Sequence, residues 1–358
     1  MTRPVRARID LQALQQNLHQ VRVSAPHSKV MAVVKANGYG HGLVAVAEAL
    51  HEADGFGVAR LEEALALRQA GIRKPVTLLE GFTNAAELET VLGHDFEVVL
   101  HSEYQLALLE AARLPVPLRV WVKLDTGMHR LGFLPACLAE IARRLEALPL
   151  VRQPLAYLSH LACADERANP VSEVQHRCFE DALQGRPGER SLANSAGLLG
   201  WPAARYDWVR PGIMLYGVSP FQDALGPELG LRPAMTLETR LIAIRELCRG
   251  DAIGYGGSWV CPEDMRVGVA AIGYGDGYPR HAAAGTPVLL RGSRVPLVGR
   301  VSMDMITLDL RGHEDVQIGD RVVLWGEGLP VEEVAAAADT IGYELLTGIT
   351  GRVQLEYD

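Results

Sequence analysis

The sequence predicts an α/β protein in which a (β/α)8 TIM-type barrel is followed by a C-terminal, mainly β domain. Between residues 10 and 217, eight short apolar or β-branched runs alternate with longer segments of helical period, which is the pattern of repeated βα units. The runs are apolar almost throughout, as expected of parallel strands buried on both faces. After residue 231 the pattern changes to period-2 alternation interrupted by Gly and Pro, which indicates a separate β domain.

We therefore expect the barrel domain over residues 1–230 and the β domain over residues 231–358, with the first few residues available to pack against the second domain. Asp10 can cap a first helix over 11–22. The barrel strands are expected at 30–36, 55–59, 75–81, 97–101, 118–125, 155–160, 190–195 and 206–212. Helices are expected between them, at 61–71, 84–94, 103–113 and 134–148. The β domain should contain extended segments at 236–247, 265–278, 287–299 and 303–310 and one helix at 331–342.

Composition excludes several classes of protein. The net charge of −8 has the wrong sign for a chain that mainly neutralises phosphate backbones, so we expect no nucleic-acid partner. No apolar run approaches the ~18 residues that span a bilayer, and we expect no membrane association. The five cysteines form no C-x-x-C pair, which argues against a metal site or a disulfide framework. The N-terminus lacks the pattern of a signal peptide, so we expect a cytoplasmic protein.

Polar side chains interrupt the apolar strands where each strand ends. In a barrel these positions meet at one rim, where catalytic groups collect. Only four lysines occur in the whole chain, so chemistry that needs an amine has four candidates. The rim candidates are Lys35, Lys123, Asp125, His160, Asn194, Ser195 and Arg210.

Lys35 lies in VVKANGYGHG, an apolar strand followed by a glycine-rich turn. An apolar approach would desolvate this amine, lower its pKa and suit it to Schiff-base chemistry. The alternative is a lysine that extends from the strand end into solvent. In VRPGIMLYG, Gly212 and Ile213 offer backbone N–H groups close to the Ser195 hydroxyl, as in an anion cradle, although an ordinary turn explains this segment equally.

Eight strings occur in an order that resembles the bacterial alanine racemase family, whose members are pyridoxal-phosphate enzymes with a barrel joined to a β domain. The strings are VVKANGYGHG, WVKLDTGMHRLGF, SHLACADE, NSAG, VRPGIMLYG, IGYGGSW, GYGDGYPR and VSMDM within VGRVSMDM, and they span nearly the whole chain. The resemblance implies interconversion of L- and D-alanine by a homodimer with composite active sites. It also implies pyridoxal 5'-phosphate as the cofactor.

The resemblance further implies a role for each site residue. Lys35 would hold the cofactor as a Schiff base, and Arg210 would face its pyridine nitrogen with support from His160. An arginine there cannot give up its proton, which limits the electron demand of the ring. The cofactor phosphate would be bound by Tyr39, Ser195 and the amides of Gly212 and Ile213.

Tyr255 corresponds to the family's second acid/base, which reaches the site from the partner subunit. Racemisation needs one such group on each face of the α-carbon, because a single base tends to return the proton to the side from which it came. Lys35 would serve the other face. The resemblance gives substrate contacts to Arg130, Met303, Tyr274 and Asp304, and it makes Lys123 a possible carbamylated lysine that positions Arg130.

Two departures from the family pattern concern the phosphate site. Gly351 replaces a tyrosine that some relatives use there, and Gln354 replaces the proline of Arg-Val-Pro, so Tyr343 is a candidate to compensate. Three other interpretations stay open at this point: a broad-specificity or serine racemase, a non-enzymatic pyridoxal-phosphate carrier, and a basic amino-acid decarboxylase. Whether the product would serve peptidoglycan synthesis or whether the enzyme degrades D-alanine also stays open.

Overall fold

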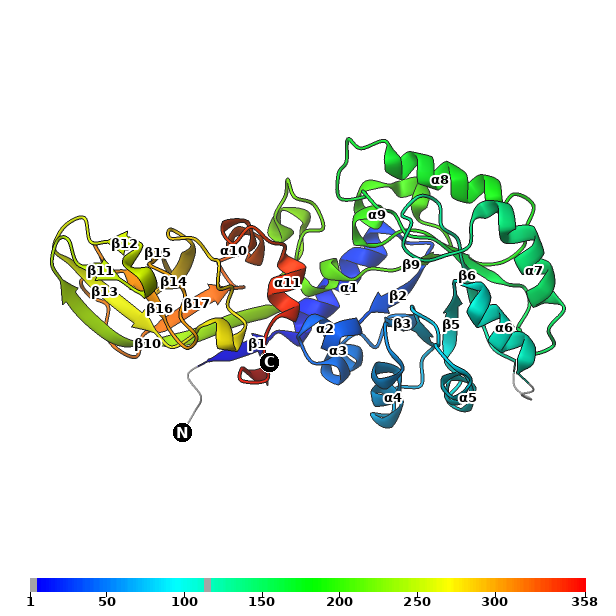
Figure 1. Ribbon diagram of the computed structural model, residues 1–358, viewed down its shortest axis with the longest axis horizontal. Helices are drawn as coiled ribbons and strands as arrows, with labels where there is room; N and C mark the ends of the chain where they lie inside the picture. Colours follow the sequence, from blue (N-terminus) through cyan, green and yellow to red (C-terminus); the bar gives the residue numbers. More distant parts are fainter. Residues whose placement is uncertain (1–4, 113–116) are drawn as a thin grey trace.

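The computed structural model describes residues 5–112 and 117–358 (Figure 1). Eight parallel strands form a closed barrel, which confirms the predicted fold class. Their bounds are β2 (Lys29–Val33), β3 (Gly55–Val58), β4 (Val76–Leu78), β5 (Glu97–Leu100), β6 (Val120–Lys123), β7 (Ala156–Leu158), β8 (Arg190–Ser191) and β9 (Trp208–Val209). In the ranges described, no helix is both long enough and apolar enough to cross a membrane.

Helices cover the outside of the barrel, and several begin at the capping residues that the sequence offers. The Asp10 carboxylate accepts a hydrogen bond from Ala13 N at 2.8 Å, as expected for the first helix, and Asn84 and Ser102 cap two others in the same way. The helices are α1 (Leu11–Ser24), α3 (Leu43–Ala49), α4 (Leu61–Gln69), α5 (Ala85–Gly93), α6 (Glu103–Ala111), α7 (Leu138–Glu146), α8 (Val171–Ala182) and α9 (Ser195–Gly200), whereas α2 (Lys35–Tyr39) is a short left-handed turn at the rim.

The barrel strands are shorter than predicted, because the polar residues at the rim do not form strand hydrogen bonds although the apolar pattern continues to them. The strand expected over 190–195 stops at Ser191, since the Asn194 side chain accepts from Gly197 N at 2.8 Å and caps α9. Likewise β2 ends at Val33, two residues before Lys35.

The β domain is an eight-stranded sheet with the order β13-β16-β15-β14-β17-β10-β1-β18. A small hairpin, β11 (Ala252–Ile253) with β12 (Trp259–Val260), forms a separate two-stranded sheet. The sheet strands are β1 (Arg6–Ile9), β10 (Met235–Leu247), β13 (Met265–Ala270), β14 (Pro287–Leu290), β15 (Ser293–Val298), β16 (Ile306–Asp309), β17 (Arg321–Trp325) and β18 (Gln354–Tyr357). Thus the N-terminal strand lies in the second domain's sheet, antiparallel to β10 and parallel to β18. The boundary near residue 230 stays a prediction.

The helix expected at 331–342 is two helices, α10 (Val331–Ala337) and α11 (Gly342–Thr347). They separate at Asp339, whose φ of 49° is left-handed. Figure 1 shows α11 at the junction of the two domains, close to α2. The approach is tight, since a Cβ on Gly40 would lie 2.1 Å from Leu346 O and one on Gly42 would lie 2.0 Å from Tyr357 Oη. The C-terminal segment therefore packs directly on the loop that follows Lys35.

Candidate active site

A cavity of about 420 Å³ opens at the carboxyl ends of the barrel strands, within the ~300–1,000 Å³ of small-molecule sites. It brings together nine of the predicted site residues: Lys35, Tyr39, Lys123, Arg130, His160, Ser195, Arg210, Gly212 and Ile213. Tyr343 and Thr347 of α11 complete the wall, so the β domain of the same chain contributes to the cavity.

Lys35 is followed by an unusual left-handed turn. Ala36 and Asn37 have φ of 54° and 55°, and Tyr39 has φ of 51°, which is strained for residues other than glycine. Polar contacts at both ends hold the turn in place. Glu63 accepts from Ala36 N at 2.6 Å, and the Asn37 side chain accepts from Leu43 N at 3.0 Å.

The expected desolvation of Lys35 is wrong. Its side chain is exposed, because β2 ends at Val33 and Lys35 lies beyond the buried strand. The accessible amine still lies where a ligand in the cavity can meet it.

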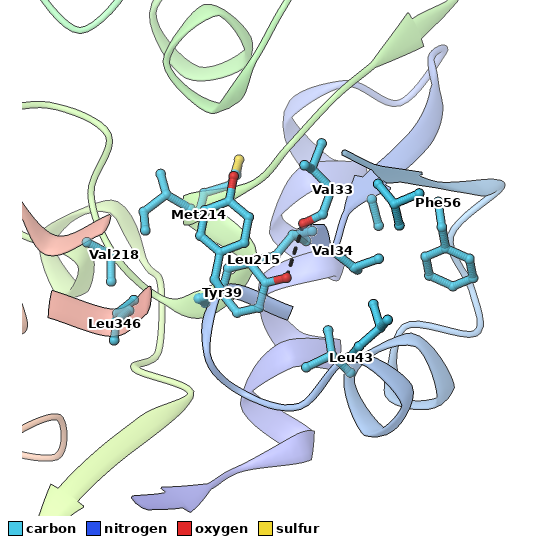
Figure 2. Close-up of a cluster of buried hydrophobic side chains, with 14 of the residues drawn as sticks. Val33, Val34, Tyr39, Leu43, Phe56, Met214, Leu215, Val218 and Leu346 are labelled. Atoms are coloured by element: carbon cyan, nitrogen blue, oxygen red, sulfur yellow. Dashed lines mark hydrogen bonds between the residues drawn. The ribbon is translucent and has the colours of Figure 1, made fainter. Parts of the chain in front are cut away.

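Tyr39 is buried and fixed in orientation. Its ring stacks on Tyr216 with centroids 4.6 Å apart, and Tyr216 Oη donates to Val33 O at 3.1 Å. Figure 2 shows Tyr39 in the apolar cluster that joins Val33 to Leu346 of α11. A Cβ on Gly212 would lie 2.5 Å from Tyr39 Oη, so only glycine admits this hydroxyl.

The hydrogen bonds of Ser195 leave its hydroxyl proton free to be donated to a ligand. Its Oγ accepts from Gly212 N at 2.9 Å and from Met214 N at 3.4 Å, which uses the lone pairs of the oxygen and leaves the proton for the cavity. Ile213 begins the 3-10 helix Ile213–Tyr216, and the N–H of a first helical residue has no partner within its own helix. Hydroxyl and amide donors thus converge beside Tyr39.

Arg210 is almost fully buried, with 5% of its surface exposed. Ser191 Oγ and Ser159 O each accept from its guanidinium at 2.5 Å, and Leu192 O accepts at 3.3 Å. Burial lowers the pKa of Arg210 to about 10, so it stays protonated at neutral pH. Among the described residues His160 makes no hydrogen bond to the guanidinium, so the support expected from His160 stays a prediction. Burial and the charge of Arg210 hold the pKa of His160 well below its usual range, so the imidazole is neutral.

Lys123 is the desolvated lysine of this rim. It is 8% exposed, and burial together with the charges of Arg130 and Arg210 lowers its pKa to about 8. Asp125, which could have paired with it, instead accepts from Gly127 N and His129 N at 3.0 Å. Among the described residues that line the cavity, Glu80 is the one carboxylate against four cationic side chains. The cavity therefore favours an anion.

We predict that Lys123→Met stabilises the cofactor-free protein at pH 7 in buffer depleted of carbon dioxide. Below pH 8 Lys123 is protonated in the folded chain, although burial and the neighbouring charges disfavour its charged form. The fall in its pKa from 10.5 to about 8 corresponds to a loss of about 3 kcal/mol in the free energy of unfolding. The gain should shrink as the pH rises from 8 to 10.5, where the unfolded lysine also loses its proton. Urea unfolding at a series of pH values measures the difference. If Lys123→Met gives no stabilisation at pH 7, or a stabilisation that does not change with pH, the lowered pKa of Lys123 is contradicted.

Four predicted site residues lie outside the cavity, on the β domain: Tyr255, Tyr274, Met303 and Asp304. Tyr255 begins the turn between β11 and β12, which Figure 1 places at the end of the β domain remote from the barrel. Tyr255 is 68% exposed, and Met303 is 51% exposed. This chain therefore does not bring Tyr255 to its own cavity.

These four residues belong to one surface, here called the β-domain face, formed by residues 254–257, 273–277 and 299–304. Gly254 packs on Arg300, since a Cβ there would lie 3.4 Å from Arg300 N. The backbone of Tyr274 donates to Ser302 O at 3.1 Å. The three segments thus present Tyr255, Tyr274 and Met303 as neighbouring parts of an exposed face.

Fold and site define an α/β-barrel protein with an anion-favouring cavity at the rim and an appended β domain. The sequence model of the alanine racemase N-terminal domain matches residues 9–220, and that of the C-terminal domain matches residues 234–357. The chain belongs to the alanine racemase family, and it is an enzyme of the isomerase class.

Individual relatives match over almost their full length. The alanine racemase of Shewanella sediminis is 56% identical over 353 residues, 99% of each protein. That of Nitrosococcus oceani is 57% identical over 346 residues, 96% of this chain and 97% of the relative. The crystal structure of the biosynthetic alanine racemase of Pseudomonas aeruginosa superposes with a TM-score of 0.97 at 48% identity and covers 100% of both chains.

Proposed function

We propose that this protein interconverts L- and D-alanine with pyridoxal 5'-phosphate as its cofactor, as a cytoplasmic homodimer. The observation that carries the proposal is the cavity itself, in which an accessible lysine lies among three further cations and one carboxylate. Such a site suits an anionic carbonyl compound that must be held covalently by an amine. The names of the relatives support alanine as the substrate.

The residues present fit this cofactor. Tyr39 Oη, Ser195 Oγ and the Ile213 amide converge as donors for its phosphate, and the glycine at 212 leaves the space that a Cβ would fill. Tyr343, whose ring centroid lies 6.1 Å from that of Tyr39, adds a hydroxyl-bearing side chain to the same wall, and we assign it the place left by Gly351. When bound, the cofactor supplies an electron-accepting ring that acidifies the α-proton of an amino acid.

Proton transfer needs a group on each face of the α-carbon. Lys35 Nζ takes or returns the proton on one face. Tyr255 of the partner subunit serves the other face through its hydroxyl, because Tyr255 of this chain is exposed and lies in the β11–β12 turn, at the end of the β domain remote from this chain's own barrel. Two chains arranged in this way would complete two identical sites.

The remaining residues bind and orient the substrate. Arg130 at the cavity rim carries the charge that pairs with a carboxylate, and Lys123 lies close enough for that charge to lower its pKa. A carbamate on Lys123 would turn this repulsion into attraction and hold Arg130 in position. Met303, through its backbone amide, would bind the carboxylate of a substrate in the partner's cavity, and Tyr274 and Asp304 would line the entrance.

The direct test is to incubate the purified protein with L-alanine and to measure D-alanine by chiral chromatography. We expect an equal mixture of the two enantiomers to form from either one, and activity to disappear when the cofactor is removed. Serine as substrate separates a strict alanine enzyme from a broad-specificity one. A protein that binds the cofactor and yet turns over neither amino acid would contradict the proposal.

For Arg210→Glu we expect slower racemisation, by about tenfold or more, and a larger share of transamination. A glutamate can hold a proton at the pyridine nitrogen, which the always charged arginine cannot, and that proton strengthens the electron demand of the ring. Pyruvate formed per D-alanine formed measures the change in partition. Arg205→Gln is a control that leaves the cavity lining intact. An unchanged rate and an unchanged partition would remove the role of Arg210.

A further inference from the structure

The β-domain face has a common support behind it. The Arg352 guanidinium donates to Asp304 Oδ1 at 2.6 Å, and its Nε lies 3.2 Å from Asp276 Oδ1. One side chain from the C-terminal segment therefore bridges two carboxylates, and these belong to the two loops that carry Tyr274 and Met303. Arg352 itself is no part of the cavity lining.

The Asp276 carboxylate organises its own loop and is 4% exposed. Its Oδ2 accepts from Gly273 N at 3.0 Å, which closes the short turn Tyr274–Asp276. A carboxylate buried to this degree needs a cationic partner, and Arg352 is the cation that the structure places against it.

Backbone contacts make the fit between the loops close. Gly275 N donates to Met303 O at 2.9 Å. A Cβ on Gly275 would lie 2.3 Å from Arg352 Nη1, and one on Gly273 would lie 2.2 Å from Ser302 O. These glycines let the guanidinium and the 302–304 backbone approach the turn, so the two loops lie in direct contact with each other and with Arg352.

The same C-terminal segment touches the other half of the site. Thr350 N donates to Asp276 O at 3.2 Å, and Thr350 Oγ1 donates to Gly275 O at 2.9 Å. Only a few residues earlier, Tyr343 and Thr347 line the cavity of the same chain. Residues 343–352 thus connect the cavity wall to the back of the β-domain face.

We propose that Arg352 is a positioning residue, which locks the loops of Tyr274 and Met303 into one rigid unit and thereby sets the affinity of the site for the substrate carboxylate. This proposal rests on the proposed function. Arg352 does not line the cavity of its own chain, and it acts through Asp276 and Asp304. Its loss leaves Asp276 buried without its cation, so both loops should loosen while the barrel cavity stays intact.

The test compares Arg352→Ala with Arg294→Ala in the cofactor-loaded protein. Arg294 is a matched control, since its side chain is 51% exposed against 50% for Arg352, and it also pairs with a carboxylate, Glu333, in the same domain. Hydrogen–deuterium exchange should rise in both 272–278 and 302–305 for Arg352→Ala and in neither segment for Arg294→Ala. Loss of a hydrogen-bonded charge predicts a KM for alanine that is about tenfold higher or more, with kcat nearly unchanged.

Further variants separate positioning from a general loss of structure. Arg352→Lys keeps the charge but lacks the planar fork that serves two carboxylates, so its KM should fall between those of the wild type and Arg352→Ala. Adding Asp276→Asn to Arg352→Ala should raise KM little further, because the two residues act as one unit. If Arg352→Ala does not fold, the same exchange and KM measurements on Arg352→Lys decide the question.

If hydrogen–deuterium exchange in the two segments is unchanged in Arg352→Ala, Arg352 does not hold the two loops together. If exchange rises and KM is unchanged, Arg352 has no role in substrate affinity. If the wild type racemises no amino acid, the proposed function fails, while the exchange measurement still judges whether Arg352 joins the loops.

Discussion

Lys35→Ala should leave less than about one part in a thousand of the racemisation rate. The substitution removes the amine that we propose to anchor the cofactor and, with it, a general base, and the base alone is typically worth a factor of ~10² to 10⁴. Lys35 lies on the exposed side of the cavity, so the change removes no core packing and the fold should persist. Rates measured in both directions with added cofactor check this result.

Lys29→Ala is the matched control, because Lys29 begins the same strand that Lys35 follows and pairs with Glu189 at the opposite end of the barrel. It should retain activity. Borohydride reduction and peptide mapping then locate the cofactor directly. With four lysines in the chain, a label on Lys29, Lys74 or Lys123 would contradict the assignment of Lys35.

Tyr255→Phe should lower racemisation by a factor of ~10² to 10⁴, the usual contribution of a general acid or base. The change keeps the ring and removes the hydroxyl of a side chain that is 68% exposed, so stability should hardly change. Tyr104→Phe serves as control, since Tyr104 is 61% exposed on the outer surface of the barrel.

The defect of Tyr255→Phe should also be unequal for the two enantiomers. In deuterated water, the enantiomer whose α-proton faces Lys35 should still exchange that proton, whereas the other should become nearly inert. NMR of the α-proton measures both rates. An equal loss of α-proton exchange for both enantiomers would mean that Lys35 and Tyr255 do not act on opposite faces of the α-carbon.

Most of the barrel could be predicted from the sequence, because its signals are local. Asp10 precedes a run of helical period, and each buried strand is a short apolar run. Strand ends were predicted less well. At Asn194 the capping preference of the side chain outweighs the apolar pattern, so β8 is short and α9 begins at Ser195.

Long-range contacts explain what the sequence could not reveal. The sequence allowed the first residues to pack against the second domain, but it did not mark β1 as a strand, because its hydrogen-bonding partners are β10 and β18, far along the chain. The burial of Lys123 and the exposure of Lys35 depend on how the rim closes, and a strand pattern does not contain that information. Similarly, Thr347 reaches the cavity only because α11 packs on the loop after Lys35, and no motif marks it.

The carboxylate pairs of Arg352 were also beyond sequence reasoning. In the sequence, Arg352 is distinguished only by its neighbours Gly351 and Gln354, which depart from the family pattern. Its partners Asp276 and Asp304 lie about 50 to 75 residues away along the chain, and only the folded β domain brings the three together.

The central claim is that each site combines Lys35 of one chain with Tyr255 of the partner subunit, and mixing two inactive homodimers tests it most directly. In a mixed dimer of Lys35→Ala and Tyr255→Phe chains, one of the two sites holds both wild-type residues. Racemisation should therefore return as subunits exchange, toward about a quarter of the wild-type rate when the two chains are equal in amount and pair at random. If mass spectrometry shows mixed dimers and no activity returns, both groups act within one chain and the account is wrong.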